Sequence, residues 1–442
     1  MASPPTRILV IGGGITGLCC AQRLLSLGLE PLLLEASSRV GGRIRTLNEA
    51  GFEFEAGPNT LLNSSQSFRS LLSDLSLEPE VIAASPSAKK RFVLFNQRLV
   101  PVPMGPLSAL TSPLLGIPGV CGALGDLVRR RPAATPQDET VDSFIRRRFG
   151  SRVMDNLVGP FLSGVYAGNP ATLEARSVLP MLVEAEQAKG SVIRGLIAKR
   201  RQSKPAGGKR PRTQGISFKG GLERLPARLK DVLGARVRTG AQVVSIRGGD
   251  AGCEVTLASG EVLAADHVVI STETAVAAGL VRDLPHGPEV AADLAAVPAS
   301  DVAVVGLAYR RSQVQHPLDG FGFLVGPGNS GPMLGCLFRS SIFPDSAPRD
   351  RVLLVSFLGG ALHDIRNESD DRLVKVVREE LAAKLGSKGD PERVFFVRWK
   401  QALPQANRGH STLRARIESW SHRGRVSIIS SGVYGAPIPK CI

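Results

Sequence analysis

The chain begins its first regular structure with RILVIGGGITGLCCAQRLLSLG (7–28), followed by PLLLEA (31–36), and these residues carry its clearest structural pattern. Residues 7–11 form a short apolar run, residues 18–27 show helical spacing, and residues 31–35 form a second apolar run. This succession predicts a strand, a glycine-rich turn, a helix and a second strand. Gly28 follows the last periodic residue, which is typical of a helix C-terminus.

The turn between the first strand and the helix carries glycines in the spacing GxGxxG, at Gly12, Gly14 and Gly17. The first glycine permits a tight turn, the second lets a pyrophosphate approach the backbone, and the third allows close packing of helix on strand. Glu35 ends the second strand, 35 − 12 = 23 residues after Gly12, where a carboxylate accepts hydrogen bonds from ribose hydroxyls. The pattern predicts a dinucleotide site, and the alternative is a glycine-rich packing turn.

Length and composition limit the remaining possibilities. At roughly 150 residues per domain, 442 residues correspond to about three domains. An apolar fraction of 43% with 21% charged residues excludes a disordered chain. The six cysteines form no CxxC pair and the six histidines have no metal-ligand spacing, so we expect no metal site and no disulfide framework.

The net charge of +16 favours anionic partners, namely nucleic acid, anionic lipid or a small molecule rich in carboxylates. The basic segment 189–212 contains no aromatic residue that could stack on a base, so we do not expect a nucleic-acid partner. The first eight residues lack a charged n-region followed by an apolar core, which predicts a protein that stays where it is made.

Residues 99–125 contain no charged residue, but they include five prolines and five glycines. A lipid-exposed span has to satisfy its backbone internally, which so many helix breakers prevent. Two alternatives remain: an apolar lobe that lines a substrate site, or a surface that dips into one leaflet, with Arg129–Arg131 at the lipid headgroups.

The second half of the chain predicts strands and one long helix. Alternating apolar and polar residues indicate strands on both sides of a Ser259-Gly260 turn, and further strands at 303–309 and 351–360. Residues 370–386 show helical spacing and end in glycine.

Three further segments, RVGGRIRT (39–46), FEAGPN (54–59) and FKGGLERLP (218–226), resemble the FAD-binding segments of amine-oxidase-like flavoproteins. Within that group the chain resembles the protoporphyrinogen oxidases, through FLSGVYAGNP (161–170), LGCLFRSSIFPDSAP (334–348) and WKQALPQANRGH (399–410). Two features depart from the family: Ala406 stands where a tyrosine is usual, and Ser430 or Ser431 replaces a glycine. Family members also continue into one more helix beyond the position of Ile442, so we expect weaker flavin binding.

The resemblance implies an α/β fold, α+β overall. It comprises a Rossmann-type FAD-binding domain, a mixed-sheet substrate domain and a helical lobe that is a candidate for membrane contact. The implied FAD-binding domain is assembled from residues 1–85, 216–285 and 405–442. The implied substrate domain comprises residues 86–101 and 286–404, and the helical lobe comprises residues 102–215.

The resemblance also implies noncovalent FAD and places the following residues at the cofactor: Gly12, Gly13, Gly14, Ile15, Thr16, Gly17, Glu35, Ala36, Gly42, Arg43, Gly57, Pro58, Asn59, Thr60, Val243, Trp399, Ala436, Pro437 and Ile438. The flavin performs the redox step, so no side chain is assigned to catalysis. A porphyrinogen assists its own oxidation, because each pyrrole nitrogen can supply electron density as a neighbouring bridge carbon loses hydride.

For the substrate, the resemblance implies that Arg91 pairs with a propionate, that Leu324 and Phe338 pack on the tetrapyrrole faces, and that the Gly168 carbonyl approaches the pyrrole NH groups. A guanidinium suits a carboxylate because its donors form a planar fork. The alternatives are a solvated arginine beside Lys89 and Lys90, and ordinary core residues.

The expected reaction is the oxidation of protoporphyrinogen IX by molecular oxygen. Coproporphyrinogen III is the alternative substrate, because its four propionates suit the basic chain. An amine or carotenoid oxidase stays possible, as does a non-catalytic binding protein of the GDP-dissociation-inhibitor type. We expect peripheral contact with the cytoplasmic membrane in a bacterium, or with the mitochondrial inner membrane in a eukaryote, and a homodimer stays open.

Overall fold

The computed structural model describes residues 7–63, 65–129, 138–202, 214–249, 252–329, 331–435 and 438–441. The predicted strand–turn–helix–strand is confirmed: β1 (Arg7–Ile11) leads into α1 (Ile15–Ser26) and then β2 (Glu30–Glu35). Both strands belong to a five-stranded parallel sheet in the order β10-β2-β1-β14-β20. Its other strands are β10 (Val237–Thr239), β14 (His267–Ile270) and β20 (Val426–Ile428).

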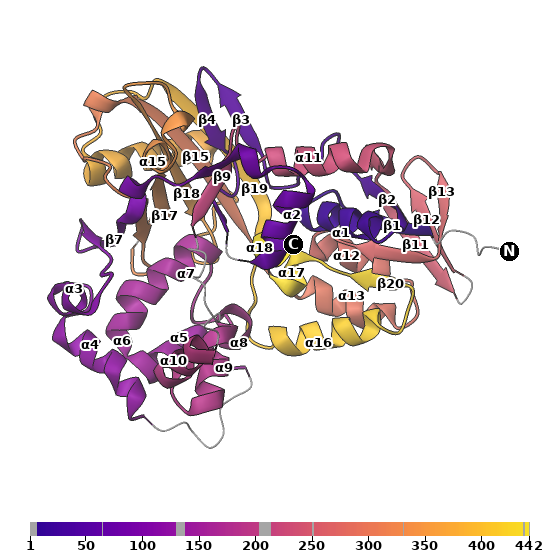
Figure 1. Ribbon diagram of the computed structural model, residues 1–442, viewed down its shortest axis with the longest axis horizontal. Helices are drawn as coiled ribbons and strands as arrows, with labels where there is room; N and C mark the ends of the chain where they lie inside the picture. Colours follow the sequence, from indigo (N-terminus) through magenta and orange to yellow (C-terminus); the bar gives the residue numbers. More distant parts are fainter. Residues whose placement is uncertain are drawn as a thin grey trace.

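Each face of the parallel sheet is covered, as its nearly continuous apolar strands require (Figure 1). On one face, α1 packs with α11 (Arg224–Leu233), and Leu18, Leu225 and Leu229 are fully buried. On the other face lie α12 (Thr274–Val281), α13 (Gly287–Ala295), α16 (His410–Ser421) and the antiparallel sheet of β11 (Val243–Gly249), β12 (Gly252–Leu257) and β13 (Val262–Ala265).

A second, seven-stranded sheet has the order β19-β15-β18-β17-β16-β7-β8 and is mixed, because β16 and β7 pair in parallel. Its bounds are β7 (Arg91–Phe95), β8 (Arg98–Pro101), β15 (Ala299–Arg310), β16 (Gly322–Val325), β17 (Met333–Phe338), β18 (Arg351–Gly359) and β19 (Arg393–Pro404). The predicted strands at 303–309 and 351–360 are β15 and β18.

The predicted helix at 370–386 is α15 (Asp370–Leu385), which covers one face of the seven-stranded sheet (Figure 1). Its N-terminus is capped by Ser369, whose hydroxyl oxygen accepts from the Arg372 N–H. Gly386 follows with φ +63°, the left-handed conformation that ends many helices. The opposite face packs on the hairpin β3 (Thr46–Glu49) and β4 (Phe52–Glu55), where Phe54 stacks on Phe395.

The helical lobe lies below the seven-stranded sheet in Figure 1. Its helices are α3 (Pro106–Thr111), α4 (Gly116–Leu124), α5 (Val141–Phe149), α6 (Ser151–Val153), α7 (Gly159–Tyr166), α8 (Ala175–Val178), α9 (Pro180–Lys189) and α10 (Val192–Gln202). The lobe has its own apolar core, which includes Val141, Phe144, Leu162 and Val192.

Short elements join the two sheets. A small antiparallel sheet has the order β5-β9-β6 and consists of β5 (Leu61–Leu62), β6 (Val81–Ala83) and β9 (Gly215–Phe218). The remaining helices are α2 (Gln66–Asp74), α14 (Arg339–Ile342), α17 (Ser431–Tyr434) and α18 (Ile438–Cys441). Because β4 packs on the seven-stranded sheet and β5 packs with the parallel sheet's helices, the loop between them crosses from one sheet towards the other.

Candidate functional site

The conformation of the turn between β1 and α1 is stabilised by a close backbone contact and by hydrogen bonds from Ser271. A Cβ atom at Gly17 would lie 2.0 Å from the Gly12 carbonyl oxygen, so only glycine fits there. The Ser271 hydroxyl, just after β14, donates to the carbonyl oxygens of Gly12 (2.9 Å) and Ile11 (3.0 Å). Sequence reasoning missed Ser271, whose only signal is its place at the carboxyl end of a third parallel strand.

The middle glycine of the turn faces open space. A Cβ atom at Gly14 would meet no described heavy atom within 4 Å, and Gly14 precedes α1 without a side-chain cap. The first N–H groups of a helix have no partner within the helix, and such a terminus attracts anions. The turn therefore provides a cradle of the kind that a pyrophosphate fills.

Glu35 lies beside this cradle and is already held by its neighbours. Its Oε2 accepts from the Gly13 N–H at 2.6 Å, and its Oε1 accepts from the N–H and hydroxyl of Ser37 at 2.8 and 2.7 Å. A carboxylate has about four acceptor positions, which leaves one on Oε2 for a ribose hydroxyl. The Ala241 N–H donates to the Glu35 carbonyl, which brings the start of β11, with buried Val243, close to this end of the cradle.

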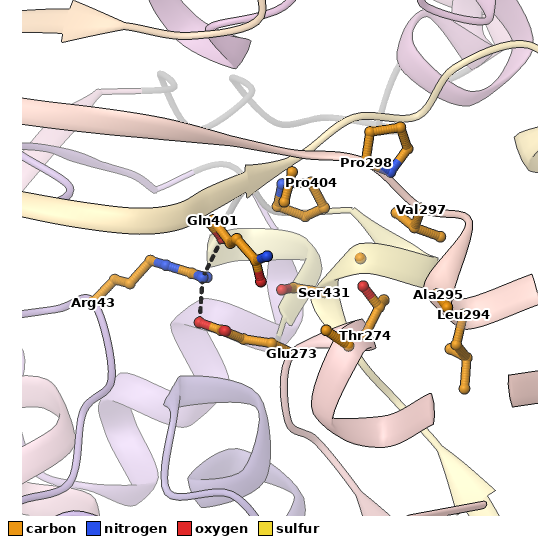
Figure 2. A pocket seen from close by; sticks show the side chains of 13 residues that line it. Arg43, Glu273, Thr274, Leu294, Ala295, Val297, Pro298, Gln401, Pro404 and Ser431 are labelled. Atoms are coloured by element: carbon orange, nitrogen blue, oxygen red, sulfur yellow. Dashed lines mark hydrogen bonds and ion pairs between the residues drawn. The ribbon is translucent and has the colours of Figure 1, made fainter. Parts of the chain in front are cut away.

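Arg43 extends from the segment that follows the cradle into a neighbouring pocket. A Cβ atom at Gly42, where φ is +56°, would lie 3.4 Å from the Gly14 Cα, so the two glycine segments touch. The Arg43 guanidinium pairs with Glu273 and donates to the Gln401 carbonyl at 2.8 Å, as Figure 2 shows. Burial lowers the pKa of Arg43. Glu273 and Gln401 were not among the predicted site residues.

The pocket beside Arg43 has a volume of about 200 Å³ and lies between β19, the start of α12 and α17 (Figure 2). Besides Arg43, its lining includes Thr274, Val297, Pro404 and Ser431. The segment that carries Ser430 and Ser431 therefore lies near Arg43, although the two are distant in the sequence.

Residues 57–60 lie on the other side of Arg43 from the glycine-rich turn and form the far end of the candidate site. A Cβ atom at Gly57 would lie 2.0 Å from the Arg43 carbonyl oxygen, and the Trp399 Nε1–H donates to the Ala56 carbonyl at 2.6 Å. The buried Asn59 Oδ1 and Thr60 Oγ1 have no hydrogen-bond partner among the described residues. Buried polar atoms are normally paired, so these two atoms fit a site whose polar ligand completes them.

The remaining predicted cofactor residues lie as follows. Ile15 is buried in the same apolar cluster as Ile438, at the start of α18. Thr16 is half-buried, whereas Ala36 is exposed and Pro58 is half-buried. Ala436 and Pro437 lie outside the described residues.

The predicted substrate residues are not all brought together. Arg91 is exposed at the start of β7, with its guanidinium 5.3 Å from the centre of the Phe321 ring. Leu324 packs against α7, where a Cβ atom at Gly164 would lie 2.3 Å from the Leu324 Cδ2. Gly168 is buried against Leu173 and Gln405.

Phe338 lies on the opposite face of the seven-stranded sheet from Leu324. It is fully buried in the cluster that contains Phe92 and Phe323, beneath α15. Phe323 points to this face, so its neighbour Leu324 points to the other, because side chains alternate along a strand. The structure therefore does not place these two side chains around one ligand.

Comparisons with known proteins find similarity along nearly the whole chain. Residues 15–442 match the model of the family described as flavin containing amine oxidoreductase. The chain is 29% identical to coproporphyrinogen III oxidase of Bacillus subtilis (strain 168), over 100% of this chain and 97% of that protein. It is 32% identical to chloroplastic protoporphyrinogen oxidase of Oryza sativa subsp. japonica, over 100% of this chain and 88% of that protein.

A crystal structure of a candidate protoporphyrinogen oxidase from Exiguobacterium sp. 255-15 superposes with a TM-score of 0.82 at 26% identity. The match covers 100% of this chain and 97% of that one. The mixed fold of two sheets and a helical lobe is thus shared with a solved structure over its whole length.

The two glycines at the start of α1 are expected to respond differently to substitution. Gly17→Ala should lower the free energy of unfolding by about 1–3 kcal/mol, because its methyl group meets the Gly12 carbonyl. Gly14→Ala should change that free energy by less than about 1 kcal/mol, because the site is open and φ is −68°. It should instead raise the Kd for FAD about tenfold or more, since the methyl group blocks the approach of the pyrophosphate.

Denaturant unfolding and fluorescence titration of the apoprotein with FAD measure the two effects. Equal losses of stability in both variants, or unchanged FAD affinity in Gly14→Ala, would contradict the assignment of this cradle.

Proposed function

The chain belongs to the flavin-containing amine oxidoreductase family, and we propose that it oxidises a porphyrinogen to the corresponding porphyrin with molecular oxygen. It is an oxidoreductase with FAD as its cofactor. The observation that carries the proposal is the end-to-end similarity to proteins named coproporphyrinogen III oxidase and protoporphyrinogen oxidase, and the open helix N-terminus at Gly14 supports it.

The described residues fit FAD along an extended path. We propose that the α1 N-terminus and Gly14 hold the pyrophosphate, that Glu35 binds the ribose, and that Val243 lies beside the adenine. Residues 57–60 and Trp399 then lie at the flavin end, where the Asn59 Oδ1 and the Thr60 Oγ1 can accept polar partners. We further propose, from the resemblance, that FAD is held noncovalently, so that acid precipitation of the protein should release it into the supernatant.

When bound, FAD supplies the acceptor for two electrons at a time, and oxygen removes them again. Porphyrinogen oxidation removes three hydrides and three protons in total, and the pyrrole nitrogens of the substrate supply the electron density. The protein therefore has to bind a broad apolar ring, orient it and exclude water. We propose that Leu324, which packs against α7, contributes to the apolar surface that the ring contacts. The Gly168 carbonyl oxygen is a candidate acceptor for hydrogen bonds from the pyrrole NH groups.

Protoporphyrinogen IX is the substrate that we propose, because the chain is 32% identical to the Oryza sativa protoporphyrinogen oxidase and 29% identical to the Bacillus subtilis coproporphyrinogen III oxidase. Coproporphyrinogen III is the second candidate. It is supported by the similarity to the Bacillus subtilis enzyme over 97% of its length and by the net charge of +16. The binding-protein alternative receives no support from these relatives.

Turnover of the two porphyrinogens tests the proposal directly. Both substrates are nonfluorescent and both products fluoresce, so the FAD-loaded protein should raise the rate of fluorescence appearance above that of protein-free autoxidation. The ratio of kcat/KM for the two substrates identifies the preferred one. Rates equal to autoxidation for both, in protein that contains FAD, would overturn the proposed reaction.

Arg91 is the candidate partner of a substrate propionate. A carboxylate that enters an apolar site loses water, and removing the partner of such a charge typically costs about 2–5 kcal/mol, so Arg91→Ala should raise KM tens-fold or more. Arg91→Lys should recover part of the loss, because a point charge lacks the fork.

Arg98 is the matched control for Arg91, because it is an exposed arginine on the adjacent strand of the same hairpin. Arg98→Ala should leave KM unchanged, and the FAD content of all three variants should match that of the original protein. An unchanged kcat/KM in Arg91→Ala for both porphyrinogens would show that Arg91 is a solvated side chain that does not bind the propionate.

We further propose that the lobe around α3 and α4 contacts a membrane surface. Met104, Leu107 and Val128 are 76%, 76% and 81% exposed, and Ile117 is also exposed. These residues belong to one stretch of the chain, 104–128, and exposed apolar surface of this kind is typical of an interaction site. Among the described residues, no helix combines the length and the apolar character that a bilayer span requires. The contact that we propose is a peripheral one, through the exposed side chains around α3 and α4.

The expected basic headgroup site needs one correction. Arg129 does not extend freely, because its Nη1 donates to the carbonyl oxygens of Gly122 and Arg148. Arg130 and Arg131 lie outside the described residues. The apolar side chains of α3 and α4, and not Arg129, therefore carry the proposal.

The double substitution Met104→Glu with Leu107→Glu should abolish flotation with anionic liposomes, because it places two charges where acyl chains would lie. Val262→Glu is the control, since Val262 is an exposed apolar residue of β13, in the sheet that packs on the parallel sheet. The original protein and the control should float at low salt. If the original protein stays at the bottom, or if both variants float equally well, the lobe is not a membrane surface.

A further inference from the structure

Arg339 is a fully buried cation that the proposed cofactor and substrate contacts do not use. It begins α14, directly after strand β17 of the seven-stranded sheet, and its side chain is 0% exposed. A buried guanidinium is costly unless its donors are satisfied, so its partners identify the segments that this charge holds together.

The partners of Arg339 lie in the β4–β5 region that leads to the flavin end of the site. Its Nη1 donates to the Asn59 carbonyl at 2.7 Å, and its Nη2 donates to the Glu53 Oε1 at 2.6 Å. Nη2 also lies 3.5 Å from the Glu55 Oε1 and the Ser217 hydroxyl. The planar fork thus spans a carbonyl of the 57–60 loop and the carboxylates at the end of β4.

Glu55 extends the same network to two further segments. Its Oε1 accepts from the Leu222 N–H at 2.7 Å, and its Oε2 accepts from the Thr46 hydroxyl at 2.9 Å. Burial raises the pKa of Glu55 to about 7, against the opposing effect of Arg339. Arg339 therefore carries the positive charge of a buried network whose acidic members are Glu53 and Glu55.

The Asn59 carbonyl lies in the loop whose side chains are left without partners. Arg339 fixes the Asn59 backbone from one side, while the Asn59 Oδ1 and the Thr60 Oγ1 stay unpaired among the described residues. The Asn59 Nδ2 also donates to the Gly57 carbonyl at 3.0 Å, so fixing Asn59 fixes the turn around Gly57.

We propose that Arg339 is a positioning residue, which holds residues 57–60 in the geometry that receives the flavin end of FAD and so connects the seven-stranded sheet to the cofactor site. The guanidinium does not have to touch the cofactor for this role. The inference rests on the cofactor assignment and not on the identity of the porphyrinogen.

A pair of buried arginines allows a controlled test. Arg148, in the helical lobe, is also 0% exposed and pairs with the buried Asp126, but it holds α5 to the segments around Asp126 and Gly190. Arg339→Met and Arg148→Met each remove one buried guanidinium and leave its carboxylate partners unpaired. Both should lower the midpoint of thermal unfolding, so stability alone does not distinguish positioning from packing.

Two readouts below the unfolding transition do distinguish them. In the apoprotein, hydrogen exchange of a peptide that covers residues 57–63 should speed up in Arg339→Met and stay unchanged in Arg148→Met. In a fluorescence titration, Arg339→Met should raise the Kd for FAD about tenfold or more, because misplaced site residues bind poorly, and Arg148→Met should leave it within about twofold.

Arg339→Lys keeps the charge and serves as a second variant if Arg339→Met does not fold. Lysine carries its charge on a single ammonium group and cannot hydrogen-bond two segments through a planar guanidinium. Arg339→Lys should therefore give an exchange rate and a Kd for FAD between those of the original protein and those of Arg339→Met. The proposal is overturned if both Arg339 variants that fold bind FAD as the original protein does, or if Arg148→Met weakens FAD binding equally. Because no porphyrinogen enters these measurements, the outcome is independent of the proposed reaction.

Discussion

Helix α1 begins in contact with its own preceding turn, and this close approach determines where the rest of the site can lie. The Gly17 Cα lies so near the Gly12 carbonyl that no side chain fits between them. The helix N-terminus is thereby directed at the carboxyl edge of the parallel sheet, where Ser271 closes the turn from β14. Open space remains above Gly14, and the partly positive end of the helix faces that space.

From this edge the site extends away from the parallel sheet, and its far end depends on the second sheet. Trp399 of β19 and Arg339 after β17 both donate to carbonyl oxygens in the segment 56–59. These hydrogen bonds join this loop to side chains that are far away in the sequence: Arg339 follows Asn59 by 280 positions, and Trp399 follows Ala56 by 343 positions. A loop held in this way can carry unpaired polar side chains inside the protein, since its backbone position is determined by other groups.

The substrate side shows how strand geometry limits what a resemblance can assign. Leu324 and Phe338 occupy paired strands of one sheet, but they point to opposite faces, towards α7 and α15 respectively. The helical lobe presents its apolar side chains outward at α3 and α4, while its buried charges, such as Arg148 with Asp126, hold it together from inside. The exposed apolar side chains are the observation behind the proposed membrane contact, whereas the interior of the lobe combines an apolar core with such buried ion pairs.

The local sequence was enough to predict the first βαβ unit, the strands β15 and β18, the helix α15 and a candidate dinucleotide site after β1. Each of these depends on contacts within about 30 residues or on a simple periodicity, which a single sequence displays. The glycine spacing and the carboxylate of Glu35 belong to this class, because helix and strand place them side by side without help from elsewhere. The resemblance added residues 57–60 and Trp399 without showing that they touch.

The contacts between distant groups at the candidate site become visible when the chain is folded. Ser271 and Glu273 carry no local pattern that distinguishes them from other surface or core residues, and Arg339 lies in a segment, 334–348, that the resemblance singled out without indicating what this arginine contacts. Their positions follow from how two sheets, built from interleaved segments of the chain, pack against each other. Whether a strand residue faces the ligand or the core also depends on which helix covers its face of the sheet. Both faces of the seven-stranded sheet are buried, so the pattern of apolar residues along a strand does not show which face meets the ligand.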